Sequence, residues 1–202
     1  MKIIEIEQRS EQWFTEKLGK PSASCFDRII TAKGAASKQS DGYMYELAGQ
    51  RITGKHEDGY TNTFMQRGID LEDEARDLFE LVTGLNVTQV GLVCEDSERY
   101  LCSPDGLIMD QSAGLEIKSP IMKTHVEYLI KDQLPATYFH QAQGSMLVTG
   151  FSYWYFMSYY PAMPVFIKII DRDAQFCVAL SKALDAFCDD LDALTEKLRD
   201  MK

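Results

Sequence analysis

Hydrophobic residues recur at helical spacing over long stretches of the chain. The clearest case is residues 70–83, where the apolar side chains share one face and Gly84 follows them, so the pattern predicts an amphipathic helix that ends at this glycine. Its apolar face comprises Leu71, Ala75, Leu78, Phe79 and Val82. The same spacing, together with capping residues and terminal glycines, predicts further helices. They cover residues 10–18, 22–30, 41–53, 123–133, 135–149 and 171–201.

Alternating or continuous runs of β-branched and aromatic residues predict strands between these helices. The N-terminal stretch MKIIEIEQRS alternates apolar and polar positions, which is also a strand pattern. Further strands are predicted at residues 90–95, 107–110, 115–118, 152–159 and 165–170. Helices before and after a group of strands favour an α/β fold with a central mixed β-sheet flanked by helices. No repeat or Pro/Gly-rich linker interrupts the pattern, so we expect one domain over residues 1–202.

The composition argues against a membrane protein and against a cysteine-based metal site. No stretch approaches the roughly 18 consecutive apolar residues that a membrane span needs, and the N-terminus lacks the apolar centre of a signal peptide. We therefore expect a cytoplasmic protein without a membrane partner. The five cysteines are an odd number without a CxxC pair, which is typical of reduced, buried thiols rather than of zinc ligands or disulfides.

The net charge of −10 at first argues against a nucleic-acid partner, but its distribution weakens that objection. Residues 56–110 carry thirteen Asp and Glu against three Lys and Arg, whereas residues 1–55 and 111–170 each carry a small excess of Lys and Arg. A DNA-binding surface would come from these two basic regions, and part of the acidic region is available for a metal site.

The stretch around Asp105 and Glu116 carries the candidate chemistry. Asp105 lies just before one predicted strand and Glu116 lies within the next, so a hairpin can bring the two carboxylates together. Glu116 and Lys118 are two residues apart on a strand and share a face, while Ile117 points into the core and leaves its carbonyl as a further oxygen ligand. Such a set of oxygen atoms suits Mg²⁺ or Mn²⁺ rather than zinc. The metal would neutralise phosphate charge and activate water, which Lys118 would place.

The pattern D…ExK also occurs by chance, because carboxylates and lysines near hairpins are common. Three features of the context favour the catalytic interpretation. Pro104 precedes Asp105 and fixes its approach, Glu116 and Lys118 flank an apolar residue within a predicted strand, and an acidic helix precedes the whole unit.

These residues resemble a known signature. Pro104-Asp105 with Glu116-Ile117-Lys118 resembles that of the PD-(D/E)XK nuclease superfamily, which has a restriction-endonuclease-like core. More narrowly, the chain resembles the bacteriophage lambda exonuclease family of viral and prophage recombination nucleases over roughly residues 10–160. The matching positions are Trp13, Lys17-Leu18-Gly19, Ser22-Ala23-Ser24, Gly68, Glu72, Ala75, Phe79-Glu80, Cys102-Ser103-Pro104-Asp105-Gly106-Leu107, Gly114-Leu115-Glu116-Ile117-Lys118, Pro120, Gln141 and Gln143.

This resemblance implies a processive, Mg²⁺-dependent exonuclease that acts on the ends of linear double-stranded DNA. Such enzymes digest the 5′-ended strand, release mononucleotides and leave a 3′ single-stranded tail, which a single-strand annealing protein uses for recombination. The resemblance also implies a pair of metal ions in each active site, with Mn²⁺ able to replace Mg²⁺. It further implies a ring-shaped homotrimer that encircles the DNA.

The resemblance assigns roles to residues of the metal site. Asp105 and Glu116 would ligate the metal together with the carbonyl of Ile117. Lys118 would serve the nucleophilic water, and Glu72 would complete the metal environment, with water as an intermediary where needed.

Three further residues match positions outside the metal ligands. Gln141 would lie beside the site, on the helix expected at residues 135–149. Lys17 and Ser24 match the region that holds the 5′-phosphate of the DNA end. The lambda pattern has arginine where this chain has Lys17, so the positive charge is retained but the bidentate fork is not. The strength of any 5′-phosphate preference therefore stays open.

Two other functions would use the same residues. An endonuclease of restriction or junction-resolving type would keep the site but would cut covalently closed circular DNA, which an exonuclease cannot do. A protein-interaction module with a vestigial metal site would digest nothing, although every expected ligand and the lysine are intact in this sequence.

Overall fold

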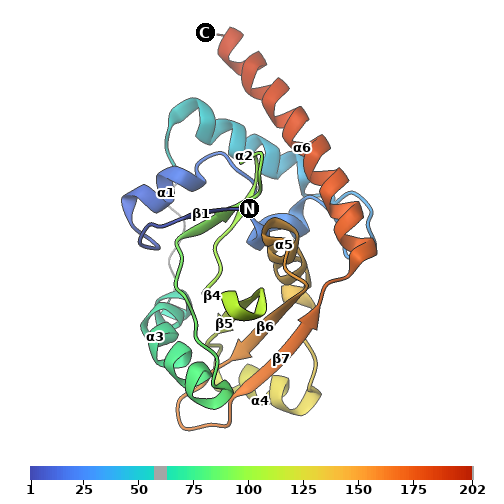
Figure 1. The fold of residues 1–202 in the computed structure, drawn as a ribbon. Coiled ribbons are helices and arrows are strands. Elements are labelled where there is room, and N and C mark those ends of the chain that lie inside the picture. The colour runs from blue at the N-terminus through green and yellow to red at the C-terminus, as the bar shows by residue number, and fades with distance from the viewer. Residues whose placement is uncertain (57–62, 202) are drawn as a thin grey trace.

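The computed structural model describes residues 1–56 and 63–201, which form two β-sheets with helices around them (Figure 1). The helices are α1 (Glu11–Lys17), α2 (Ser40–Thr53), α3 (Thr63–Thr83), α4 (Met122–Lys131), α5 (Phe139–Thr149) and α6 (Ala174–Asp200). The strands are β1 (Lys2–Ile4), β2 (Leu92–Cys94), β3 (Leu101–Cys102), β4 (Gly106–Ile108), β5 (Ala113–Lys118), β6 (Tyr153–Ser158) and β7 (Phe166–Asp171). The α/β architecture expected from the sequence is confirmed.

The larger sheet has the strand order β4-β5-β6-β7. β5 and β6 run parallel while both outer pairs are antiparallel, so this is the mixed sheet that the sequence predicted. Leu115 and Ile117 of β5 pack in one buried cluster with Ala75 and Phe79 of α3. Because side chains alternate along a strand, Glu116 points to the opposite face. The strand thus directs apolar side chains toward α3 and its acidic side chain toward α5.

A second, smaller sheet has the antiparallel order β1-β2-β3, and the sequence did not predict it as a separate layer. β3 is too short to give a periodic pattern, which explains why it was missed. The chain passes from β3 in this sheet to β4 in the larger one through residues 103–105. Pro104 has no N–H to donate to either ladder, so the strand is interrupted at this point.

Two predicted helices begin differently in the structure. Residues 22–30 form a short 3₁₀ turn at Ala23–Arg28 instead of an α-helix, and no side chain caps its start. The helix expected from Pro135 begins only at Phe139, because Pro135 is extended, with ψ of 131°, and a single 3₁₀ turn follows it.

Two further boundaries also shift. α3 begins at Thr63, before the amphipathic stretch that predicted it. The strand expected at residues 107–110 ends at Ile108, where a 3₁₀ turn and Ser112, with φ of 50°, reverse the chain into β5. The other predicted helices and strands are confirmed with shifts of a few residues at their ends.

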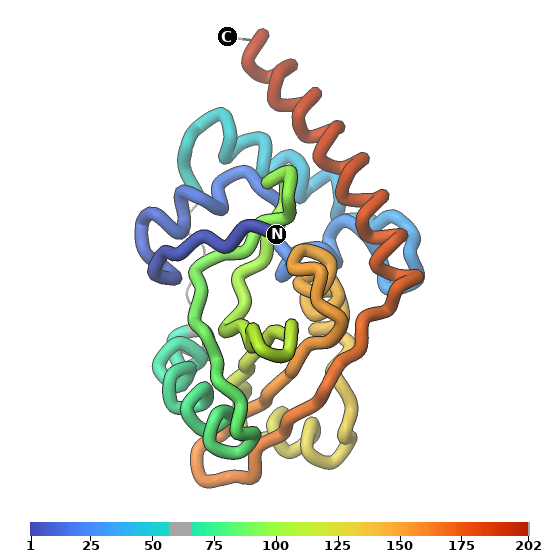
Figure 2. Tube along the Cα trace, viewed as in Figure 1, coloured from blue at the N-terminus to red at the C-terminus, as the bar shows by residue number. Residues whose placement is uncertain are grey.

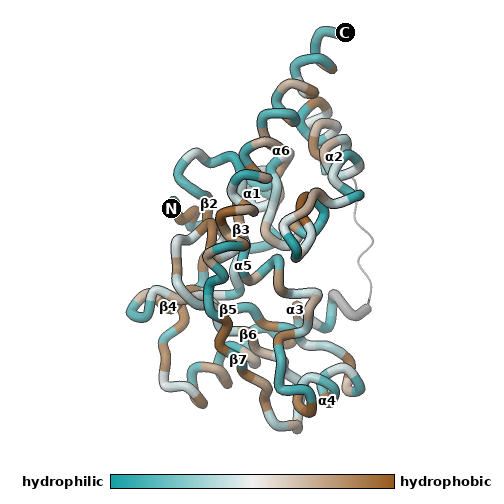
Figure 3. Tube along the Cα trace, turned by 90° about the vertical axis from the view of Figure 1, so that its right-hand side faces the viewer, coloured by the Kyte–Doolittle hydropathy of each residue, from teal (hydrophilic) through white to brown (hydrophobic). Residues whose placement is uncertain are grey.

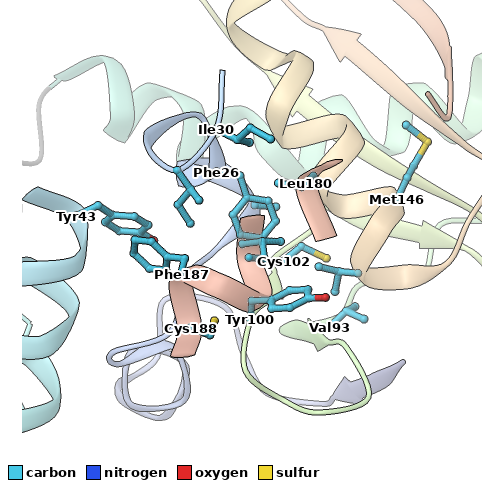
Figure 4. Close-up of a cluster of buried hydrophobic side chains, with 14 of the residues drawn as sticks. Phe26, Ile30, Tyr43, Val93, Tyr100, Cys102, Met146, Leu180, Phe187 and Cys188 are labelled. Carbon is cyan, nitrogen blue, oxygen red and sulfur yellow. The ribbon is translucent and has the colours of Figure 1, made fainter. Parts of the chain in front are cut away.

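The larger hydrophobic core lies where α2, α5, α6 and the small sheet meet (Figure 4). Phe26 is fully buried at its centre, and the rings of Tyr43 and Phe187 stack with centroids 5.7 Å apart. All five cysteines are free thiols, and every one except Cys25 is buried, as the composition predicted.

α6 continues beyond the rest of the fold at its C-terminal end (Figure 2). Its earlier turns bury Phe176, Leu180, Leu184, Phe187 and Leu191 in the core, whereas the projecting turns are largely hydrophilic (Figure 3). None of the helices in the described part of the chain is long and apolar enough to cross a membrane.

Gly114 of β5 makes room for the ring of Trp154, its partner on β6. A Cβ at Gly114 would lie 2.1 Å from Cη2 of Trp154, which is fully buried and cannot move aside easily. We expect Gly114→Ala to lower the free energy of unfolding by about 1–3 kcal/mol, measured by urea denaturation.

Gly49→Ala is the matched control for this substitution. Gly49 lies in α2 with open space where its Cβ would be, so alanine there should be neutral or stabilise the fold by about 0.5–1 kcal/mol. Equal stability of the Gly114→Ala and Gly49→Ala variants would contradict the packing described for β5.

Candidate active site

Asp105 lies in the connection between the two sheets and is held against β5. Its own N–H donates to the Leu115 carbonyl at 3.1 Å, and its Oδ2 accepts the Ile117 N–H at 2.6 Å. The second bond exists because β4 pairs only with the first half of β5, which leaves the edge beyond Leu115 without a strand partner. Asp105 therefore caps β5 at the point where its polar side chains begin.

Glu116 is buried under α5, with 3% of its surface exposed. Its Oε1 accepts a hydrogen bond from Gln141 Nε2 at 2.6 Å and another from Lys118 Nζ. Its Oε2 is buried and has no hydrogen-bond partner among the residues that the structure describes. A buried charged oxygen without a partner is unfavourable, so this atom indicates a missing ligand.

The carbonyl of Ile117 is also placed to face this ligand. The N–H and C=O of one residue in a strand point to the same edge, and the Ile117 N–H points to Asp105 rather than to β6. The side chain of Ile117 lies in the core beside α3. The structure thus brings Asp105, Glu116 and the Ile117 backbone to one edge of β5, as the sequence predicted.

The charges at this edge are unbalanced. Burial and, to a smaller extent, the nearby Glu116 carboxylate together raise the pKa of Asp105 to about 8. Burial opposes the charge of Lys118, but Glu116 and Asp105 outweigh that effect and raise the pKa of its ammonium group. The buried Glu116 and the half-buried Asp105 share this one lysine, so a bound cation would stabilise their carboxylates. Carboxylate and carbonyl oxygens suit Mg²⁺ or Mn²⁺, and the residues present fit such an ion.

Glu72 lies near these ligands but is engaged elsewhere. It lines a pocket of about 470 Å³ together with Asp105, Ile117 and Lys118. Its two oxygens bind arginines, Oε2 accepting from Arg9 and Oε1 from Arg76 at 2.8 Å. Within the described residues, no three His, Cys, Asp or Glu side chains group closely enough to form a metal site by themselves. The structure therefore places Glu72 at the pocket without making it a third carboxylate ligand.

Three side chains that sequence analysis did not assign to the site hold residues 103–105 in place. Trp13 Nε1 donates to Ser103 Oγ at 3.2 Å, Gln8 Nε2 donates to the Pro104 carbonyl at 2.8 Å, and Arg76 Nε donates to the Asp105 carbonyl at 3.2 Å. These bonds position the Asp105 carboxylate through its backbone.

The spacing of Glu72 and Arg76 was the one available signal for these contacts. Residues four apart on a helix are neighbours, and this pair forms an ion pair. Nothing in the local sequence marks Gln8, because its partners Val90 and Pro104 are far away in the chain.

Lys17 forms a second charged site at the end of α1. Its Nζ lies 3.9 Å from the centre of the Trp13 ring, and it makes no ion pair with any residue that the structure describes. Burial lowers the pKa of Lys17 to about 8. A half-buried ammonium group without an acidic partner among the described residues is open to an anion.

Ser24 is exposed in the 3₁₀ turn that follows α1, and its Oγ lies 3.1 Å from Ser22 Oγ. Burial raises the pKa of the Cys102 thiol. The Glu116 carboxylate raises this pKa slightly, and the Lys17 ammonium group lowers it slightly.

Comparisons with known proteins find a matching family profile and similar solved structures. The family profile of the YqaJ-like viral recombinase domain matches residues 12–152. The crystal structure of an alkaline exonuclease, LHK-Exo from Laribacter hongkongensis, superposes with a TM-score of 0.85 at 34% sequence identity, covering 95% of this chain and 97% of that one. The structure of LHK-Exo in complex with dAMP gives the same values.

A more distant structure supports the fold alone. The phage-related exonuclease from Haemophilus somnus 129PT has a TM-score of 0.68 at 17% identity, covering 89% of this chain and 96% of that one. No curated protein matches the chain at a significant level.

The half-buried charge of Lys17 should weaken the fold at neutral pH. Lys17→Met keeps most of the length of the side chain and removes the charge, so we expect it to raise the free energy of unfolding at pH 7. Each pKa unit corresponds to about 1.4 kcal/mol, and the Trp13 contact returns part of the cost, so the expected gain is roughly 1–2 kcal/mol. Urea denaturation from pH 6 to pH 10.5 measures it.

The gain should have a defined pH dependence. Because the pKa of Lys17 is lowered to about 8 by folding, the unfolded chain binds more protons than the folded one above that pH. Wild-type stability therefore rises relative to the variant above pH 8, and the difference closes near the ordinary lysine pKa of about 10.4. Lys38→Met, at an exposed position, is the control, and its stability relative to wild type should not change in this way with pH. A Lys17→Met variant less stable than wild type at pH 7 would contradict the assignment.

Proposed function

This chain belongs to the lambda exonuclease family of YqaJ-like viral recombinase domains and is a recombination nuclease, and we propose that it is a metal-dependent 5′-to-3′ exonuclease. It would digest the 5′-ended strand of linear double-stranded DNA, release mononucleotides and leave a 3′ single-stranded tail. The observation that carries the proposal is the unpartnered, buried Oε2 of Glu116 near Asp105. A cation held between the two carboxylates is the simplest ligand that satisfies this atom.

The chain's own residues divide the work of hydrolysis. Asp105, Glu116 and the Ile117 carbonyl would hold Mg²⁺, or Mn²⁺ in its place, and two ions in each site are part of the proposal. When bound, the metal neutralises phosphate charge and makes water a better nucleophile. Lys118, beside Glu116, would orient the attacking water and stabilise the charge that develops on the phosphate.

Gln141 and Glu72 would support these ligands. Gln141 donates to Glu116 Oε1, which fixes the carboxylate and leaves Oε2 directed at the ligand. Glu72 lines the same pocket, so it can contact a water bound there rather than the ions directly. Both residues are therefore proposed to position the reacting groups.

Lys17 and Ser24 are proposed to hold the 5′-phosphate of the DNA end. The support is the lack of an acidic partner for the half-buried Lys17 among the described residues. A phosphate would supply the missing negative charge, and the Ser24 hydroxyl would add a hydrogen-bond donor. Because lysine provides a single ammonium group, the pocket recognises charge more than shape.

The proposal extends to partners by family membership. A ring-shaped homotrimer would surround the duplex, and a single-strand annealing protein would receive the 3′ tail. Exposed apolar residues support contacts with other protein chains. They are Leu81 and Val82 at the end of α3 and Ile121, Met122, Val126 and Ile130 at α4.

End-labelled linear duplex and covalently closed circular DNA test the reaction. We expect the wild-type protein to convert the linear duplex to mononucleotides with Mg²⁺ or Mn²⁺, to do nothing with Ca²⁺ or with a chelator, and to leave the circle intact. Asp105→Asn should lower the rate by about 10³-fold or more while DNA binding persists, because one carboxylate of the cation site is lost.

Asp110→Asn is the matched control, since Asp110 is an exposed acid on the turn after β4 and should be dispensable. Cutting of the closed circle would favour the endonuclease alternative. Digestion by Asp105→Asn at the wild-type rate would show that Asp105 does not belong to the active site. A wild-type protein without nuclease activity would support the interaction module with a vestigial metal site.

The preference for phosphorylated ends should depend on pH through Lys17. The pKa of this lysine is about 8, so it loses its charge in alkaline solution, whereas arginine stays protonated. We expect the ratio of digestion rates on 5′-phosphate and 5′-hydroxyl ends to fall several-fold from pH 7 to about pH 9.5. In Lys17→Arg the ratio should stay nearly constant.

Taking the ratio cancels the effect of pH on hydrolysis itself, because both substrates use the same catalytic groups. A ratio that declines equally in wild type and Lys17→Arg would show that another group controls recognition of the end.

A further inference from the structure

Arg9 is held in a backbone conformation that arginine rarely adopts. Its φ is 65°, in the left-handed region that favours glycine. Four other described non-glycine residues have positive φ, and none of them lines the pocket above Asp105. Unfavourable backbone of this kind gathers at functional sites, where the surrounding structure maintains it. The position therefore gives a reason to ask what the guanidinium group does.

The contacts of Arg9 and Arg76 with Glu72 are unequal. Arg76 is 8% exposed and is held by Glu72, by Asp73 at 2.7 Å and by the Asp105 carbonyl. Arg9 is 39% exposed, and its side chain makes a single hydrogen bond within the described structure, to Glu72 Oε2. Glu72 would keep one arginine partner if Arg9 moved away. Arg9 is thus the cation that can be exchanged at low cost.

Arg9 also stands at the boundary of two pockets. It lines the pocket of about 470 Å³ with Asp105 and Lys118, and it lines a second one of about 660 Å³ that also includes Asp105. Glu72 belongs to both. Because Arg9 and Asp105 line both pockets, the Arg9 side chain borders the same space as the Asp105 side of the site.

We propose that Arg9 binds a phosphate of the DNA strand in this pocket and exchanges the Glu72 carboxylate for phosphodiester oxygens. This inference rests on the proposed function. A guanidinium group matches two phosphate oxygens in a bidentate contact, so the exchange replaces one charge-assisted pair with another. It also frees Glu72 Oε2, which accepts from Arg9, to face the pocket.

Arg9→Gly and Arg9→Lys separate this role from a structural one. Glycine suits the positive φ, so Arg9→Gly should fold with a melting temperature equal to or above that of wild type. Duplex binding is measured in Ca²⁺ over a range of salt concentrations, and digestion is measured in Mg²⁺. Arg199→Gln is the control, because Arg199 is also exposed and paired with a glutamate but lies at the far end of α6.

Loss of one phosphate contact should lower the slope of log affinity against log salt by about 0.9 in Arg9→Gly. Its affinity should fall about tenfold or more at a fixed salt concentration. Arg9→Lys should recover the slope with weaker binding, and Arg199→Gln should match wild type. The KM for DNA in Arg9→Gly should rise more than kcat falls.

The outcomes distinguish failure of the role proposed for Arg9 from failure of the proposed nuclease function. If the wild-type protein digests linear DNA but Arg9→Gly keeps the wild-type salt slope, the role of Arg9 is wrong and the proposed function stands. If Arg9→Gly loses stability along with affinity, Arg9 has a structural role and the inference is overturned. If the wild-type protein neither binds nor digests duplex, the proposed function and the inference fail together.

Discussion

The hydrogen bond from the Ile117 N–H to Asp105 Oδ2 joins the connection between the two sheets to the strand that carries Glu116 and Lys118. It requires β4 to begin only at Gly106, so that the edge of β5 beyond Leu115 has no strand partner. Pro104 contributes by interrupting the strand, and the side chains of Gln8, Trp13 and Arg76 then fix residues 103–105 from outside. The position of Asp105 relative to Glu116 is therefore set by hydrogen bonds to the backbone of β5 and by the bonds that hold residues 103–105, and the two carboxylates do not need to contact each other.

The parts of this arrangement that depend on local spacing were visible in the sequence. Glu116 and Lys118 share a face because they are two residues apart on a strand, and the amphipathic pattern of α3 places its apolar side against β5. The parts that depend on distant pairing were not visible. β1 pairs with β2 and Gln8 reaches Pro104 only because the chain returns after more than eighty residues, and no local pattern encodes such a return. The contact of Arg9 with Glu72 was not visible in the sequence for the same reason, because the two residues lie on different elements far apart in the chain.

The acidic net charge is compatible with binding to DNA because part of that charge is used inside the protein. Along α3, Glu72 binds two arginines, Glu74 accepts a hydrogen bond from the Tyr159 hydroxyl, and Glu80 accepts the Val87 N–H at 2.6 Å. These carboxylates repel an approaching phosphate less than free ones would, since their charges are offset or directed inward. For the approach of DNA, the electrostatic potential at the pocket therefore matters more than the net charge of the whole chain.

Two groups of opposite charge lack partners in the described structure: the carboxylate oxygen Oε2 of Glu116 and the ammonium of Lys17. The fold alone could remove both costs by bringing the groups together, yet they form no ion pair with each other in the described structure, and each stays available to a separate ligand. An ion pair between them would have stabilised the folded chain and closed both sites. A metal cation at Glu116 and a phosphate at Lys17 would satisfy the two groups together, and a DNA end with its bound metal would present both charges at once. The lack of partners at these two positions is thus the same property that would let the protein recognise its proposed substrate.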